Sequence, residues 1–132
     1  MKRLAICAIF VLLGSPLSVS ADFTSKAQIE DYAISRAVLH NVSVTKTIAI
    51  ISAESNFTVN AKNPSSTASG LAQFIDGSFE WLCMDRYKLT QSLDDKNDPK
   101  IQIECLVLTL KDGGDSHWNE SKPVWSKIVD AQ

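Results

Sequence analysis

The stretch that decides the fold is Ile50–Trp81, with the sequence IISAESNFTVNAKNPSSTASGLAQFIDGSFEW. It begins with an apolar run of helical character, which carries one acid, Glu54, at its end. A polar loop follows, and the small-residue turn at positions 69–71 then introduces a segment that contains Gln73. We expect the rest of the chain to pack so that it holds Glu54 against a groove.

The surroundings of Glu54 favour a carboxyl group that keeps its proton near neutral pH. In the last turn of a helix the carboxyl lies beside the partial negative charge of the helix terminus. Its apolar neighbours Ile50, Ile51 and Phe57 also disfavour the charged form. The sequence therefore predicts a raised pKa, which suits a general acid. The alternative is an ordinary, solvated acid at a helix end.

The start of the chain has the pattern of a secretory signal peptide over residues 1–21. A positive start at positions 2–3 precedes an apolar run over residues 4–13, and small residues at positions 19–21 suit cleavage. The alternative, a retained membrane anchor, needs an apolar run of about 20 residues, which this one does not reach. We therefore expect residues 22–132 to be exported to the periplasm or the extracellular space, with no membrane span.

Length and charge describe one small, mildly acidic domain. The remaining residues, 22–132, are near the commonest domain size. The whole chain has a formal net charge of −2, and removal of Lys2 and Arg3 makes the mature chain more negative. No basic cluster is present that would bind phosphates, so we expect no nucleic-acid partner.

The cysteines and histidines predict a disulfide bond and no metal site. Of three cysteines, only Cys83 and Cys105 follow the signal peptide. In an exported domain this number suggests one disulfide, and two free thiols are the alternative. His40 and His117 are the only histidines, which leaves no ligand set for zinc. His40 is expected at the surface near a helix end rather than as a catalytic base.

Periodicity and capping signals predict a mostly helical fold with six modest helices. They are expected from Thr24 or Ser25 to about residue 39, from Ser43 or Thr45 to about residue 55, over residues 70–74, from Ser78 to about residue 87, from Asp98-Pro99 to the glycine pair at 113–114, and from Ser121 onward. Residues 88–97 are predicted to be a surface loop. Trp81 and Trp125 are expected in the core, and Trp118 either there or stacked on a ligand.

Several motifs together resemble those of a known family. They are Glu54-Ser55-x-Phe57, then Ala61 and Ser66, then Gly70-Leu71-x-Gln73, and later Asp98-Pro99 with Gln102-Ile103. This series is similar to the soluble-lytic-transglycosylase (SLT) and goose-type lysozyme group, with Gln in place of the family's Asn at position 102. The two motifs at Glu54 and Gln73 are fairly specific in this spacing.

The resemblance implies a small α+β lysozyme-like domain whose sugar-binding groove holds the glycan strand of peptidoglycan. It implies cleavage between N-acetylmuramic acid and N-acetylglucosamine, with no cofactor. Glu54 would first protonate the leaving oxygen and then act as base. Gln73 would line the sugar groove and Ser66 would lie near the acid. The alternatives are a surface amide for Gln73 and a plain loop residue for Ser66.

The sequence leaves the function open between three classes of protein. No convincing second acid lies in the motif region, where Asp76 and Glu80 read as surface residues. That favours a single-acid lytic transglycosylase over a lysozyme-type hydrolase that uses two carboxyl groups. The family's tyrosine-bearing motifs have no clear counterpart, which supports a catalytically silent peptidoglycan-binding or assembly module. A remodelling role within an envelope secretion or conjugation complex is a further hypothesis.

Overall fold

The computed structural model describes residues 22–23 and 25–132, and the predicted signal peptide at residues 1–21 lies outside them. The described chain is mostly helical, as the sequence predicts. The elements in order are α1 (Lys26–Leu39), α2 (Val44–Ser55), α3 (Asp76–Phe79), the π-helical η1 (Glu80–Arg86), the 3-10 helix η2 (Leu93–Asn97), α4 (Pro99–Lys111), the 3-10 helix η3 (Asp115–Trp118) and α5 (Lys122–Asp130). Between residues 25 and 132 the only β-structure is two isolated bridges, Lys62 to Ser69 and Ser69 to Phe74.

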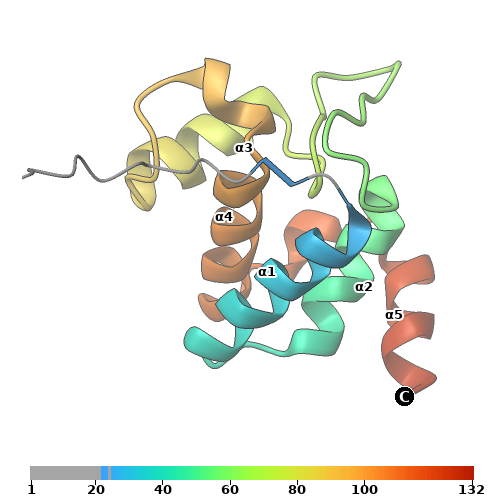
Figure 1. Ribbon diagram of the computed structural model, residues 1–132. Coiled ribbons are helices and arrows are strands. Elements are labelled where there is room, and N and C mark those ends of the chain that lie inside the picture. The colour runs from blue at the N-terminus through green and yellow to red at the C-terminus, as the bar shows by residue number, and fades with distance from the viewer. Residues whose placement is uncertain (1–21, 24) are drawn as a thin grey trace, which may run out of the picture.

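Helix α2 lies at the centre of the arrangement. It packs against α1 on one side and α5 on another, and α1 also packs against α4 (Figure 1). The long loop over residues 56–75 extends from the C-terminal end of α2 (Figure 1). Fully buried side chains of α2, α3, α4 and this loop form much of the core, among them Ile50, Ile51, Leu71, Phe79, Ile103 and Leu106. This packing fixes the position of the end of α2, where Glu54 lies.

Two predicted helix starts are confirmed in atomic detail. Ser25 and Gln28 form a reciprocal capping box at the start of α1. Asp98 accepts hydrogen bonds from the backbone N–H groups of Lys100 and Ile101, and Pro99 occupies the first turn of α4. Both signals are local, because they need only residues within one turn of the helix end.

The prediction of a helix over residues 70–74 is wrong. This segment is a turn in which Gln73 has a left-handed backbone (φ 52°), and the N–H of Ser69 donates to the carbonyl of Phe74 (3.2 Å). A helix cannot continue through a left-handed residue. The next helix also begins earlier than predicted, at Asp76 rather than at Ser78.

Two further expectations are corrected in the following segment. Trp81 was expected in the core, but its side chain is 53% exposed. The loop expected over residues 88–97 contains η2, in which Lys96 is buried and donates to the backbone carbonyl of Thr67 and to Asp76 Oδ1 (2.7 Å). Trp125, by contrast, is buried as predicted.

Covalent and ionic links hold α4 in place. The predicted disulfide is formed between Cys83 in η1 and Cys105 in α4. Closing a loop of this length stabilises a fold by about 3 kcal/mol in the chain-entropy model. On the other side of α4, Glu104 accepts hydrogen bonds from Arg36 (2.5 and 2.8 Å) and lies 2.7 Å from His40 Nε2. His40 is therefore a partly buried link between α1 and α4.

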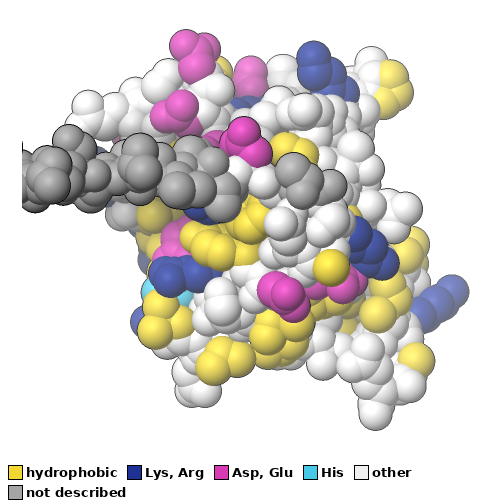
Figure 2. Space-filling view, in the orientation of Figure 1, with side chains coloured by type: hydrophobic (Ala, Val, Ile, Leu, Met, Phe, Trp, Pro, Cys, Tyr) yellow, Lys and Arg dark blue, Asp and Glu magenta, His cyan; other side chains and the backbone are white. Residues whose placement is uncertain are grey.

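The surface formed by the described residues includes exposed apolar side chains on helix α1. None of the helices in the described part of the chain combines the length and the apolar character needed to cross a bilayer. Helix α1 exposes three large apolar side chains, Ile34, Val38 and Leu39. Figure 2 shows hydrophobic side chains at the surface around this helix, interspersed with charged ones.

Candidate active site

The C-terminal end of α2 places Glu54 at the edge of the core. Ser55 is the last helical residue and is buried, while Asn56 and Phe57 both have left-handed backbones (φ 47° and 62°). A left-handed bulky residue is strained, so tertiary packing must stabilise it. The phenyl ring of Phe57 is only 7% exposed and supplies that packing. The helix therefore stops one residue after Glu54.

The turn that presents Gln73 is assembled by a buried amide from α4. Gln102 accepts a hydrogen bond from the N–H of Ala72 (2.9 Å) and donates to the carbonyl groups of Ser69 (3.2 Å) and Lys96 (2.6 Å). Gly70 has φ +82°, and a Cβ there would lie 2.5 Å from Gln102 Nε2. Only glycine therefore allows this close approach.

The side chain of Gln73 is fixed by its own turn. Its Nε2 donates to the carbonyl oxygens of Ala61 (3.0 Å) and Gly70 (2.9 Å). These two bonds use both amide protons. The amide oxygen is then the atom of this side chain that can accept a hydrogen bond from a bound hydroxyl or acetamido N–H.

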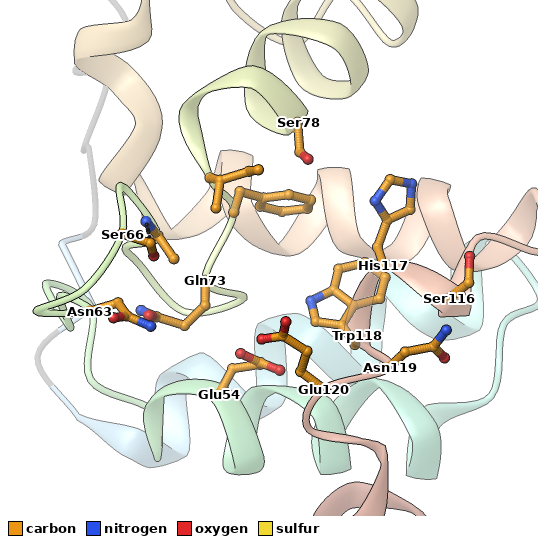
Figure 3. Close-up of a pocket in the computed structure, with 13 residues that line it drawn as sticks. Glu54, Asn63, Ser66, Gln73, Ser78, Ser116, His117, Trp118, Asn119 and Glu120 are labelled. Atoms are coloured by element: carbon orange, nitrogen blue, oxygen red, sulfur yellow. Dashed lines mark hydrogen bonds between the residues drawn. The ribbon is translucent and has the colours of Figure 1, made fainter.

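The predicted site residues Glu54, Ser66 and Gln73 line the same pocket, which has a volume of about 520 Å³. Its other lining residues are Asn63, Ala68, Phe74, Ile75, Ser78, Ser116, His117, Trp118, Asn119 and Glu120. Figure 3 shows the carboxyl groups of Glu54 and Glu120 and the side chain of Gln73 around this space. Ser66 lies exposed on the rim, where its hydroxyl accepts a hydrogen bond from the N–H of Ala68 (3.1 Å).

Ser121 contacts Glu54 directly. Its hydroxyl donates a hydrogen bond to Glu54 Oε1, and its oxygen also lies 3.2 Å from the carbonyl oxygen of Trp118. That carbonyl already accepts a hydrogen bond from Trp125 Nε1 (2.9 Å). Ser121 occupies the N-cap position of α5 as predicted, but its side chain makes no capping hydrogen bond. Its hydroxyl instead lies within hydrogen-bonding distance of both Glu54 Oε1 and the carbonyl oxygen of Trp118.

The electrostatics of the pocket raise the pKa of Glu54. Burial of the carboxyl group is the main cause, and the negative charge of Glu120 adds to it. The hydrogen bond from Ser121 acts in the opposite direction because it favours the carboxylate. The upward shift of the Glu54 pKa agrees in direction with the prediction from the sequence.

Glu120 and Ser121 were missed at the sequence level as parts of this site. Both come from the segment that follows η3, and Ser121 is 67 positions away from Glu54. No local pattern marks them. The packing of α5 against α2 brings them to the pocket.

Trp118 forms a wall of the pocket. Its ring is 4% exposed, and its Nε1–H donates to the carbonyl of Ala72 (2.9 Å). The indole thus connects η3 to the turn that carries Gln73, and it packs edge-on against Phe74 with ring centroids 5.7 Å apart. Among the described residues, no group of three or more His, Cys, Asp or Glu could hold a metal ion.

Comparison with known protein families identifies the chain. The sequence model of the transglycosylase SLT domain matches residues 31–120, well over half of the chain. The protein belongs to the transglycosylase SLT family. This confirms the resemblance found in the motifs. SLT domains are glycosidase-like and cleave peptidoglycan, a substrate that lies outside the cytoplasm.

The matched segment contains every pocket-lining residue from Glu54 to Glu120 and ends one position before Ser121. No curated protein and no solved structure matches this SLT protein significantly.

Proposed function

We propose that this SLT protein is a lytic transglycosylase that cleaves the bond between N-acetylmuramic acid and N-acetylglucosamine, with Glu54 as its catalytic acid and base. The observation that carries the proposal is the partly buried carboxyl group of Glu54, which opens into a pocket and has a raised pKa. A carboxyl group with a raised pKa keeps its proton to higher pH than an ordinary glutamate does, and it can donate that proton to a leaving oxygen.

In this proposal, Ser121 selects the oxygen of Glu54 that carries that proton. Because its hydroxyl donates to Oε1, the proton of the neutral carboxyl group belongs on Oε2. Oε2 would then donate to the glycosidic oxygen as the bond from that oxygen to the anomeric carbon breaks. The carboxylate left behind keeps its hydrogen bond from Ser121, which stabilises the new charge.

The second half of the reaction uses the same carboxylate as a base. It takes the proton from the 6-hydroxyl of the muramic acid ring while that oxygen bonds to the anomeric carbon. The products are a 1,6-anhydro sugar and a free 4-hydroxyl, and no water is consumed. Gln73, through its amide oxygen, and Ser66, through its hydroxyl, would bind hydroxyl or acetamido groups of the strand.

One observation favours a second candidate, a lysozyme-type hydrolase. Glu120 provides a second carboxyl group at the pocket, which the motif region lacks. Glycoside hydrolases usually have two carboxyl groups that flank the glycosidic bond, and the second acts as nucleophile or activates water. The field of Glu120 acts on Glu54, so the two groups are close enough to be coupled electrostatically.

The test is digestion of purified peptidoglycan, with mass spectrometry of the products. Transglycosylation gives anhydro-muramoyl ends, and hydrolysis gives reducing ends that are heavier by one water. Glu54→Gln should abolish both products. If the folded variant still digests the wall at the wild-type rate, Glu54 is not the acid. If wild type binds the wall without turnover, the protein is a binding module.

The same variant should not be less stable than wild type at neutral pH. Because the folded state raises the pKa of Glu54, the contribution of this group to stability is lost as pH rises through the folded pKa. Glutamine does not ionise and avoids this loss. Thermal unfolding therefore serves as the folding control for Glu54→Gln.

A further inference from the structure

Four aromatic rings form a continuous row that leads out of the pocket. Phe74 contacts Trp118, and Trp118 contacts His117 with ring centroids 6.0 Å apart. His117 in turn lies 6.2 Å from Trp81, with the two rings inclined by 37°. The first three rings line the pocket, so Trp81 adjoins its outer end.

Trp81 presents its ring to solvent. Its side chain is 53% exposed, whereas Trp118 and Trp125 are each 4% exposed. The neighbouring side chains Leu82 and Cys83 on η1 are buried and already cover the core. A tryptophan has the largest apolar surface of any side chain, so leaving half of it in water forgoes stabilisation that burial would provide. Packing of the described chain does not account for its position.

We propose that Trp81 and His117 form a sugar-binding subsite outside the pocket, on which an N-acetylhexosamine ring of the glycan strand stacks. This inference rests on the proposed function, because it extends the same groove. The occupant follows from continuity: His117 belongs both to the pocket wall and to the surface pair. A polymer whose cleaved bond lies beside Glu54 must continue beyond the pocket along its walls.

The chemistry of the pair fits a sugar better than a charged group. A pyranose ring has an apolar face of C–H groups, which can lie on an indole ring, and a rim of hydroxyl groups. The indole N–H and the imidazole nitrogens can form hydrogen bonds with that rim. The pocket beside them already contains the carboxyl groups of Glu54 and Glu120, which disfavour an anionic group at this place. An uncharged N-acetylglucosamine unit is therefore the ring best suited to this place.

The test compares the binding of a short and a long ligand. We use the disaccharide and the hexasaccharide of N-acetylglucosamine with wild type and Trp81→Ala, measured by calorimetry. Loss of the stacking surface should weaken hexasaccharide binding roughly three- to tenfold and leave disaccharide binding unchanged. Trp81→Phe keeps a ring and should recover part of the loss. Leu39→Ala, which also truncates an exposed apolar side chain, is the matched control.

A spectroscopic measurement reports on the same subsite. Trp81 is the exposed one of the three tryptophans, so it should dominate quenching of the fluorescence by iodide. The hexasaccharide should protect wild type from quenching, and the disaccharide should not.

The outcomes separate the two proposals. Equal affinity of wild type and Trp81→Ala for the hexasaccharide, with no protection from iodide, would overturn the subsite alone. An equal loss for both ligands would also overturn it, because it would indicate a general structural effect. If wild type binds neither ligand and cuts no peptidoglycan, the proposed function fails and the subsite fails with it.

Discussion

The hydroxyl of Ser121 provides the sharpest test of the acid–base chemistry, because replacement by alanine removes one atom that contacts Glu54. The Ser121→Ala variant keeps the backbone hydrogen bonds at the start of α5, which come from Val124 and Trp125 to the carbonyl of residue 121. The side chain makes no capping bond that would also be lost. The carbonyl of Trp118 keeps its hydrogen bond from Trp125.

The magnitude follows from the charge that Glu54 acquires. In the proposed mechanism, the group becomes a carboxylate as its proton moves to the leaving oxygen, and the hydrogen bond from Ser121 strengthens. Hydrogen bonds to charged groups contribute about 1.5–3 kcal/mol. Since roughly 1.4 kcal/mol corresponds to a factor of ten in rate, kcat should fall by about ten- to a hundredfold.

The pH dependence should change in a defined direction. Ser121 lowers the pKa of Glu54 against the effect of burial, so its removal raises that pKa further. In the proposed mechanism the free enzyme needs a protonated Glu54, so its activity should fall as pH rises through this pKa. The alkaline limb of the profile of kcat/KM should therefore move to higher pH in Ser121→Ala. The variant retains the other ionisable side chains of the pocket, His117 and Glu120.

The assay is release of soluble fragments from purified peptidoglycan over a range of pH. The pKa of Glu54 is followed independently by ¹³C NMR of protein labelled at the glutamate carboxyl. Ser121→Thr keeps a hydroxyl and should retain most of the activity. Ser116→Ala, which removes an exposed hydroxyl from the same pocket, is the matched control. An unchanged kcat together with an unchanged pKa of Glu54 in Ser121→Ala would refute the reasoning.

Three further predictions concern the pocket and its supports. Glu120→Gln removes a negative charge, so the pKa of Glu54 should fall and the alkaline limb of activity should move to lower pH; an unmoved limb in the same pH series would contradict this. Gly70→Ala should destabilise the fold by more than about 1 kcal/mol in chemical unfolding, because its Cβ would clash with Gln102 in a left-handed turn. Cys83→Ser should lower the free energy of unfolding by about 3 kcal/mol, and reductant should then have no further effect on the thermal midpoint.

The parts of the fold that could be predicted depend on neighbours in sequence. The capping box at Ser25 and the start of α4 at Asp98 are determined within one helical turn, and both predictions are confirmed. The identification of Glu54 and Gln73 as residues of one site also rested on a short, contiguous stretch. Both line the pocket, although their roles in catalysis remain predictions.

The predictions that failed concern residues whose state depends on distant contacts. The sequence of the turn at Gln73 is compatible with a helix. The turn is stabilised instead by Gln102, thirty positions beyond Ala72, which accepts a hydrogen bond from the N–H of Ala72. Tryptophan is a large apolar residue of the kind expected in a core, but the position of η1 leaves the side chain of Trp81 exposed to solvent. The sequence around Ser121 predicts an ordinary helix cap. The packing of α5 against α2 brings its hydroxyl into contact with Glu54.

The site can be understood as a balance of opposite influences on one carboxyl group. Burial, the C-terminal end of α2 and Glu120 favour the neutral form of Glu54. The hydroxyl of Ser121 favours the carboxylate. In the proposed mechanism, Glu54 changes from acid to base within one reaction cycle, and it therefore needs influences of both kinds.

This balance predicts how the double variant Ser121→Ala/Glu120→Gln behaves. The two substitutions shift the pKa of Glu54 in opposite directions, so its value in the double variant should lie between those of the single variants. The hydroxyl that we propose directs the proton to Oε2 is still missing, so kcat should remain as low as in Ser121→Ala. The NMR titration and the peptidoglycan assay measure the two quantities separately. A recovery of kcat along with the pKa would mean that Ser121 acts only through charge and does not orient the proton.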